Sequence, residues 1–175
     1  MHKAVFLDRD GVINQKAPEG QYITRWEDVQ LFPDVAEAIA LLHDYQFMVI
    51  VVSNQRCVAK GLLSVEGLEQ LHRQMLDHLS RRNAPIDAVY YCPHEQVPAC
   101  TCRKPAPGML LKAAAEHLID LPGSWMVGDS DVDIEAGKKA GCRTVRILRD
   151  SIVSQVQADL SAPSLLEAAR MVTKD

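Results

Sequence analysis

Near its N-terminus the chain has an apolar run that ends abruptly in two aspartates spaced two residues apart, VFLDRDG at positions 5–11. A short uninterrupted apolar run is typical of a strand buried on both faces of a parallel sheet. The carboxylates then lie at the carboxyl end of the strand, where open α/β sheets bind ligands. Because residues i and i+2 of an extended segment point the same way, Asp8 and Asp10 can face one small volume. Close carboxylates repel unless a cation or a proton relieves them, so the pair predicts a charged site rather than solvated loop acids.

Strand-like and helix-like patterns alternate along the rest of the chain. This alternation predicts an α/β fold, a Rossmann-like parallel sheet with helices on both faces. The 175 residues, 47% of them hydrophobic, suit a single domain spanning 1–175. The predicted strands are 3–7, 47–52, 88–91, 125–127 and 143–148, the helices are 33–45, 64–79, 108–118, 134–140 and 165–172, and the long loops are 11–32 and 92–107. The first loop directly follows the aspartates and is interpreted as an active-site flap.

Charge and hydropathy exclude several functional classes. The net charge is −4, so no basic field indicates binding to nucleic acid or to an anionic membrane. No apolar run approaches the roughly 18 residues of a membrane span, and the N-terminus lacks the apolar core of a signal peptide. We therefore expect a cytoplasmic protein with neither a membrane nor a nucleic-acid partner.

Three further segments follow the aspartate pair in a set order. Ser53 ends the second apolar run, Lys104 precedes a predicted helix, and GDSDVD at positions 128–133 follows another short run. Together these segments resemble the haloacid dehalogenase (HAD) superfamily of phosphotransferases. Its pattern is Asp-x-Asp-Gly, then Ser or Thr, then Lys, then Gly-Asp-x-x-x-Asp. Each segment alone is a weak signal, whereas the ordered set is specific and implies a HAD-like fold.

The resemblance assigns chemical roles that suit these residue types. A phosphate monoester is dianionic, so its hydrolysis needs charge neutralisation, an in-line nucleophile and help for the leaving group. Asp8 is expected to attack phosphorus and form an aspartyl-phosphate, while Asp10 protonates the leaving alkoxide and then activates water. The Ser53 hydroxyl is expected to bind phosphoryl oxygens, and Lys104 brings a positive charge to the same oxygens and to Asp8.

Magnesium is the cation that the resemblance implies. Hard Mg²⁺ prefers carboxylate, carbonyl and phosphate oxygens. The implied ligands are the Asp8 carboxylate, the backbone carbonyl of Asp10 and the Asp129 carboxylate. Asp133 lies one helical turn further on and is expected to support the site from outside the ligand set.

The loop 92–107 carries a second candidate metal site. It contains three thiols and one imidazole at Cys92, His94, Cys100 and Cys102. Cys₃His is a common structural zinc set, and four protein ligands leave no open position for a reacting water. The alternative is a group of unrelated cysteines. A zinc ion here would hold the two cations that follow, Arg103 and Lys104, so its removal is expected to lower activity by disordering the loop.

The cysteine loop narrows the resemblance to a HAD subgroup without a cap domain. That subgroup contains D-glycero-D-manno-heptose-1,7-bisphosphate 7-phosphatases and histidinol-phosphate phosphatases. The matching segments are 6–11, 53–55, 90–94, 100–105, 107–111 and 126–129. The resemblance implies hydrolysis of the 7-phosphate of the heptose bisphosphate by a monomer. Histidinol phosphate or another small phosphomonoester is the alternative substrate. A binding module without activity is disfavoured, because both aspartates of the first motif are present.

Substrate-binding residues are also carried over from the resemblance. Arg103 either binds a second phosphate or braces the loop. The chain departs from the subgroup after Gln55, where Arg-Cys-Val replaces Ser-Gly-Ile, and at Ser130, where a lysine is common. The flap is also longer, so only Tyr22 aligns within it. The full expected set is Tyr22, Asn54, Gln55, Arg56, Arg103 and Ser130.

The remaining histidines and cysteines receive no functional role. The odd number of cysteines argues against a disulfide framework. Cys142 is expected to be a small buried hydrophobe, and Cys57 has no assigned role. Surface positions are expected for five histidines without a partner pattern, namely His2, His43, His72, His78 and His117.

Overall fold

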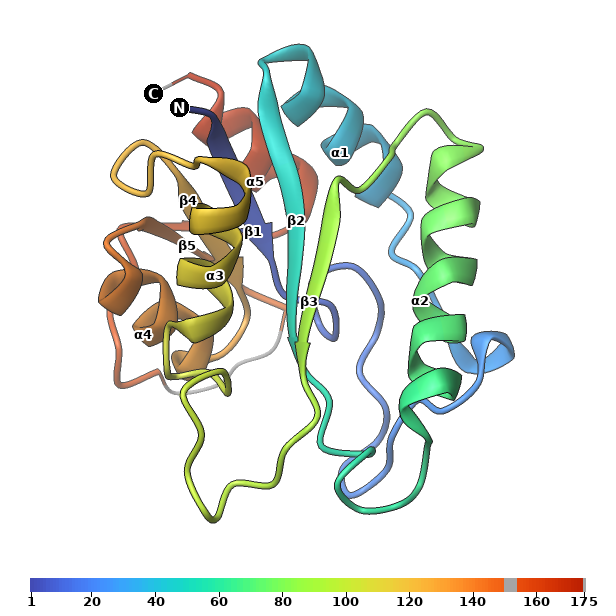
Figure 1. Cartoon of the computed structure of the whole chain (residues 1–175). Helices are drawn as coiled ribbons and strands as arrows, with labels where there is room; N and C mark the ends of the chain where they lie inside the picture. Colours follow the sequence, from blue (N-terminus) through green and yellow to red (C-terminus); the bar gives the residue numbers. More distant parts are fainter. Residues whose placement is uncertain (150–153, 175) are drawn as a thin grey trace.

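The computed structural model describes residues 1–149 and 154–174 and has a six-stranded sheet at its centre (Figure 1). The strand order is β3-β2-β1-β4-β5-β6, and each pair of neighbours is parallel. This confirms the predicted parallel α/β fold. The strands are β1 (Lys3–Leu7), β2 (Phe47–Asn54), β3 (Ala88–Cys92), β4 (Trp125–Gly128), β5 (Arg143–Ile147) and β6 (Leu160–Ala162).

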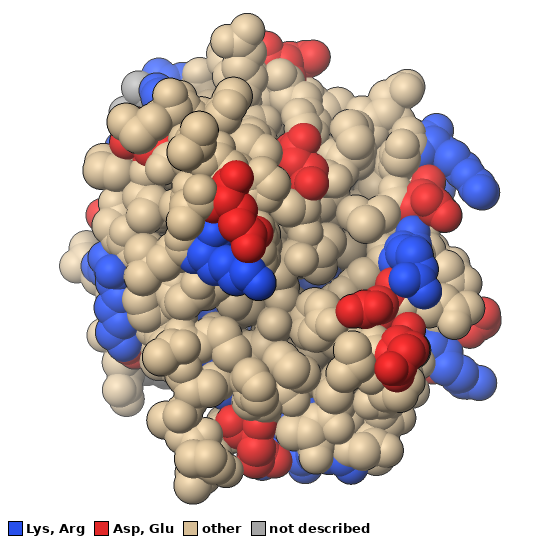
Figure 2. Space-filling model, viewed as in Figure 1, with Lys and Arg blue, Asp and Glu red and all other residues tan. Residues whose placement is uncertain are grey.

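Helices cover both faces of the sheet, as predicted. Helices α1 (Val35–Asp44), α2 (Val65–Ser80) and α5 (Leu165–Val172) contribute to one hydrophobic core. Helices α3 (Gly108–His117) and α4 (Asp131–Ala140) contribute to the other (Figure 1). Within the described residues, no helix combines the length and apolarity needed to cross a membrane. On the face drawn in Figure 2, Lys and Arg lie among Asp and Glu, without a continuous basic patch.

Strand β1 explains why the N-terminal apolar run is uninterrupted. Val5 and Leu7 join the core under α1 and α5, whereas Ala4 and Phe6 join the core under α3 and α4. Successive side chains of a strand point to opposite faces, so a strand covered on both sides is apolar at every position. Full burial of a side chain such as Phe6 stabilises the fold by about 1.5–3 kcal/mol. The strand is therefore a rigid support for whatever follows Leu7.

The order of the strands places a crevice at the carboxyl end of β1. From β1 the chain moves outward through β2 to β3, then returns to β4 on the other side of β1 and continues to β5 and β6. Ligands in open α/β sheets bind where the strand order reverses in this way. The backbone N–H of Asp8 donates to Val127 O at 3.0 Å, so the first aspartate lies between the ends of β1 and β4.

The predicted elements differ from the structure at their ends. Strand β2 continues to Asn54, and α4 begins at Asp131, three residues before the predicted start, behind a capping box formed by Ser130 and Asp133. The three-residue strand β6 was not predicted, because so short a segment has little periodicity. The flap contains one short helix, η1 (Trp26–Asp28).

Candidate active site

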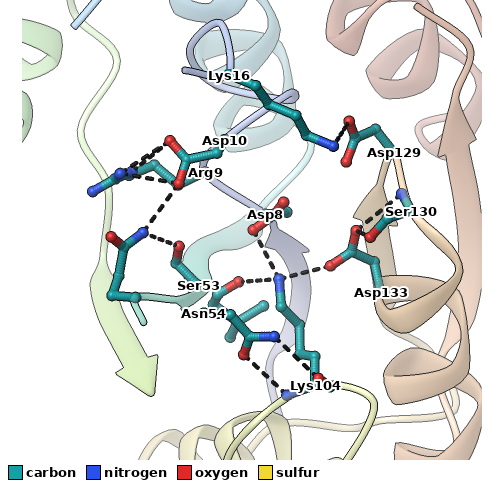
Figure 3. A network of polar contacts seen from close by, with 12 residues as sticks. Asp8, Arg9, Asp10, Lys16, Ser53, Asn54, Lys104, Asp129, Ser130 and Asp133 are labelled. Carbon is teal, nitrogen blue, oxygen red and sulfur yellow. Dashed lines mark hydrogen bonds and ion pairs between the residues drawn. The ribbon is translucent and has the colours of Figure 1, made fainter. Parts of the chain in front are cut away.

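Lys104 is the centre of a buried ionic network at the carboxyl ends of the strands (Figure 3). Its ammonium lies 2.8 Å from Asp8 Oδ1, 2.7 Å from Asp133 Oδ1 and 2.8 Å from the carbonyl oxygen of Val52. Only 2% of the Lys104 side chain is exposed, and an ammonium has three donors. Burial lowers the pKa of Lys104, but the Asp133 and Asp8 carboxylates outweigh burial and raise it. Lys104 is therefore charged, and all its donors are used.

Asp8 sits at the end of β1 in an environment that disfavours its charge. Burial raises its pKa, the ammonium of Lys104 lowers it, and the Asp133 and Asp10 carboxylates raise it again, to about 7. A further cation would stabilise the ionised form of a carboxylate cluster of this kind. The net effect is a carboxylate that one lysine does not fully neutralise.

Asp10 faces the same cavity as Asp8 but has different partners. Arg9 Nη2 donates to both of its oxygens, at 3.0 and 2.9 Å, Asn14 Nδ2 donates at 2.9 Å and Gln55 Nε2 at 3.1 Å. Burial raises the pKa of Asp10, but Arg9 and these hydrogen bonds together lower it below its ordinary value. The two aspartates of the motif thus differ in proton affinity, with the higher pKa at Asp8 and the lower one at Asp10. This order is opposite to that of an ionised nucleophile at Asp8 and an acid at Asp10, so those roles require a cation beside Asp8 and a change of partners at Asp10.

His72, which contacts Arg9, is not where the sequence predicted it. His72 was expected at the surface, yet its side chain is only 4% exposed and its Nε2 lies 3.4 Å from Arg9 Nη1. Burial and the Arg9 charge lower the pKa of His72 to about 3, so the ring is neutral. The helical spacing of Leu68, Leu71 and Met75 includes position 72 in the apolar stripe of α2, and that signal could have identified the burial.

Two acidic residues after β4 complete the polar centre. Asp8, Asp129 and Asp133 offer carboxylate oxygens that all lie within 4.8 Å of one another. Asp133 uses Oδ1 for Lys104 and Oδ2 for the Ser130 hydroxyl, at 2.5 Å. Asp129 Oδ1 and Asp133 Oδ1 are both buried without a hydrogen-bond partner, but Asp133 Oδ1 forms the ion pair with the Lys104 ammonium. The orphaned oxygen of Asp129 fits a hard cation, and Asp133, which is already paired with Lys104, suits a supporting position.

Residues after β2 build the floor of the site. Ser53 is buried, and its Oγ accepts a hydrogen bond from Gln55 Nε2 at 2.7 Å. Asn54 clamps the backbone of Lys104, because its Nδ2 donates to the Lys104 carbonyl and its Oδ1 accepts from the Lys104 amide, both at 3.0 Å. The Asn54 side chain therefore fixes a neighbouring loop, and a direct substrate contact would require it to release that loop.

The remaining predicted binding residues divide between two adjoining cavities. Tyr22, Gln55 and Ser130 line a cavity of about 270 Å³ together with Asp8 and Asp10. The second cavity, of about 580 Å³, shares Asn54, Lys104 and Val132 with the first and adds Arg103 and Lys139. Arg56 lines neither cavity and forms an ion pair with Glu95 instead. Arg9 and Lys16 also line the first cavity and were not predicted, because the residue between Asp8 and Asp10 is expected to point away from them in an extended segment, and Lys16 stands in no local pattern.

The loop after β3 brings its thiols and imidazole together. The sulfur–sulfur distances are 3.3–3.5 Å, and Cys102 Sγ lies 3.2 Å from His94 Nδ1. Tetrahedral zinc with bonds of about 2.3 Å would place its sulfurs about 3.8 Å apart. Cys100 and Cys102 are partly exposed, and the cysteines are not joined as disulfides. Three thiols and an imidazole converging on one point fit a tetrahedral metal ion.

Sequence comparisons place the chain among known hydrolases. A family model described as HAD-hydrolase-like matches residues 101–168. The D-glycero-D-manno-heptose-1,7-bisphosphate 7-phosphatase of Thermosynechococcus vestitus is 38% identical over 97% of this chain and 94% of its own length. The D-glycero-beta-D-manno-heptose-1,7-bisphosphate 7-phosphatase of Rhodopseudomonas palustris is 41% identical over 79% of each chain.

A solved structure supports the same relationship. The D,D-heptose 1,7-bisphosphate phosphatase of B. bronchiseptica, complexed with magnesium and phosphate, superimposes with a TM-score of 0.88. It is 29% identical in sequence, and the match covers 98% of both chains. The similarity therefore includes the whole sheet and the loops at its carboxyl edge.

Proposed function

Since this chain belongs to the D-glycero-D-manno-heptose-1,7-bisphosphate 7-phosphatase family of HAD-like hydrolases, we propose that it removes the 7-phosphate of that sugar bisphosphate. The observation that carries the proposal is the 2.8 Å contact between Lys104 Nζ and Asp8 Oδ1 beside a cavity of about 270 Å³. A buried carboxylate oriented by a lysine at the end of a strand suits attack on phosphorus. The choice of a sugar bisphosphate comes from the relatives.

The proposed reaction has two steps. The Asp8 carboxylate attacks phosphorus, so an oxygen–phosphorus bond to Asp8 forms while the ester oxygen–phosphorus bond breaks. Asp10 gives a proton to the leaving alkoxide and later takes one from the water that cleaves the aspartyl-phosphate. Because Arg9 holds the pKa of Asp10 low, Asp10 has to leave Arg9 and take up a proton before it acts as an acid. The products are a sugar monophosphate and inorganic phosphate.

Magnesium is the cofactor that we propose for this centre. Asp8, the backbone carbonyl of Asp10 and the orphaned Oδ1 of Asp129 would hold it. Bound there, the ion supplies positive charge against the phosphoryl oxygens. Lys104 supplies the same kind of charge from the chain itself, but its three donors are used by protein oxygens, so binding of a phosphate requires it to exchange at least one of them.

We assign the cysteine loop to structural zinc. The proposed ligands, Cys92, His94, Cys100 and Cys102, fill four positions and leave none for a reacting water. The Arg103 backbone N–H lies 3.4 Å from Cys100 Sγ, so the loop that carries Arg103 is tied to the cluster. The metal would therefore keep Arg103 at the second cavity.

The second cavity suits the phosphate that is not transferred. Its lining includes Arg103, Lys104 and Lys139 and no carboxylate. A guanidinium can bind a phosphate through two parallel hydrogen bonds. We infer that a substrate with phosphates at both ends would place one beside Asp8 and the other near Arg103, within the single domain 1–175.

The deciding experiment compares phosphate release from both anomers of D-glycero-D-manno-heptose 1,7-bisphosphate with release from histidinol phosphate, all with Mg²⁺. We expect a kcat/KM for one heptose anomer at least about a hundredfold above that for histidinol phosphate, equivalent to about 3 kcal/mol of discrimination. Equal or faster release from histidinol phosphate would replace the substrate assignment while leaving the fold and the mechanism intact. The Asp8→Asn variant serves as the inactive control for background phosphate release.

A further inference from the structure

The flap, residues 11–32, closes one side of the first cavity and reaches across to a metal-ligand candidate. Lys16 and Tyr22 of the flap line this cavity with Asp8 and Lys104. Lys16 Nζ also lies 2.5 Å from Asp129 Oδ2, although 43% of the Lys16 side chain is exposed and only 6% of Asp129 is (Figure 3). Lys16 of the flap therefore forms an ion pair with Asp129, which directly follows β4.

The backbone is shaped to admit this lysine. At Gly11 a Cβ would lie 2.7 Å from Lys16 Cε and would collide with the Asp129 carboxylate. The φ of Gly11 is +96°, which L side chains rarely adopt. The position thus allows the Lys16 stem to pass over the chain next to the Asp129 carboxylate, so the ion pair belongs to the packed site and is not a chance surface contact.

Asp129 can serve a metal and Lys16 at once. Its Oδ2 faces Lys16, and its Oδ1 is buried without a hydrogen-bond partner. A carboxylate that binds a cation through one oxygen commonly has its other oxygen fixed by a donor, which orients the ligand. Lys16 and a hard cation would therefore use different oxygens of the same side chain.

We propose that Lys16 is a positioning residue that ties the flap to Asp129 and turns Asp129 Oδ1 toward the metal. The proposal rests on the proposed function for the identity of the metal. The flap then has a second contact with a cationic side chain, because Lys60 Nζ lies 5.5 Å from the centre of the Tyr22 ring. Binding of metal and placement of the flap are coupled through one carboxylate.

The first test measures flap order without substrate. Amide hydrogen exchange is followed at Gln21, whose N–H donates to Pro18 O within the flap tip, and at Phe32, whose N–H donates to Ile13 O at the flap base. In Lys16→Met we expect exchange at Gln21 to accelerate about fivefold, the factor for about 1 kcal/mol, with Phe32 unchanged. Lys16→Arg should retain most of the protection. The matched control is Lys112→Met, an exposed lysine on α3.

The second test adds Mg²⁺ to the wild-type protein and to Lys16→Met. We expect Gln21 to stay protected when the wild type is saturated, and calorimetry to show weaker Mg²⁺ binding by Lys16→Met, by about fivefold. If Mg²⁺ speeds exchange at Gln21 toward the value of the variant, the lysine competes with the metal and the proposal is wrong. Equal exchange in the wild type and Lys16→Met without metal would also overturn it.

A kinetic measurement separates positioning from a general structural defect. With the heptose bisphosphate we expect Lys16→Met to raise KM and the half-saturating Mg²⁺ concentration about fivefold, with kcat changed less than about twofold at saturation. Lys16→Arg should restore both values. A fall in kcat alone would contradict the proposal. If the heptose bisphosphate is not a substrate, the exchange and calorimetry results still decide the role of Lys16.

Discussion

The aspartate centre and the cysteine loop are both candidate metal sites, yet the protein builds them in different ways. In the aspartate centre Asp8 follows a central strand, Asp133 lies in the first turn of α4, and both are buried around Lys104. Most of the cysteine loop lies outside regular structure, and Cys100 and Cys102 are partly exposed. The first site is held by strong charge-assisted contacts within the chain, and the second by weak contacts among thiols.

The comparison shows two sources of order. A site at the ends of packed strands is positioned by the hydrophobic cores before any ion binds. A site on a loop gains its order from the ion, because metal binding contributes to the free energy of folding. Lys104 belongs to both regions, since it follows the cysteine cluster in sequence and its backbone is clamped to Asn54.

The largest effect is expected from a substitution that abolishes catalysis at the aspartate centre without changing the fold. Asp8→Asn should lower kcat by at least about a thousandfold, because an amide oxygen cannot form the aspartyl-phosphate. Circular dichroism should match that of the wild type, since strand β1 is unchanged. Substantial turnover of an aryl phosphate by the purified variant would mean that Asp8 is not the nucleophile.

Stability should distinguish a central lysine from a surface one. Lys104→Met leaves Asp8 and Asp133 buried without their shared cation, which we expect to destabilise the protein by about 3–5 kcal/mol. Urea unfolding of the variant in EDTA measures the loss. Lys112→Met is the control and should stay within about 0.5 kcal/mol, because 65% of that side chain is exposed. Equal losses would show that the buried network contributes little.

The raised pKa of Asp8 predicts a pH dependence for the metal-free aspartate centre. The folded state retains the Asp8 proton up to a pKa of about 7, whereas the unfolded chain loses it near 3.8. The stability contributed by this proton is therefore complete below about pH 4 and is lost as pH rises through 7. In EDTA we expect about 3 kcal/mol less stability at pH 8 than at pH 5 from this group. The same scan of Asp8→Asn should lack this component, and an identical slope would assign it elsewhere.

The smallest effect is expected from the cysteine loop. Cys100→Ser should lose bound zinc, measured by elemental analysis, and should lower kcat/KM about tenfold through displacement of Arg103. The hydrogen bonds from Asn54 should keep the Lys104 backbone in place when the metal is lost. The double variant Asn54→Ala/Cys100→Ser should therefore lose more activity than the sum of the two single effects predicts. Full activity in a metal-free Cys100→Ser protein would show that the loop needs no ion.

Local patterns were sufficient wherever the interacting residues are neighbours in sequence. The apolar run before Asp8 predicted a buried strand, and the cluster Cys92 to Cys102 predicted convergent metal ligands within one loop. The surface position predicted for His72 is wrong because its place on α2 belongs to the apolar stripe, and that spacing outweighs the polarity of the imidazole. The sequence predicted that Asn54 binds substrate but did not predict its hydrogen bond to the Lys104 backbone, because Lys104 is 50 residues away in the chain.

By itself the sequence determined the alternation of strands and helices, the carboxyl-edge position of Asp8 and Asp10, and the grouping of the thiols. These features follow from side-chain periodicity and short spacing, which are properties of the local chain. The family resemblance predicted the contact of Lys104 with Asp8, but only the tertiary structure decided that Lys104 also reaches Asp133, and that Lys16 crosses Gly11 to reach Asp129. Contacts between distant residues depend on how the strands are ordered and how the cores pack, and local periodicity carries neither.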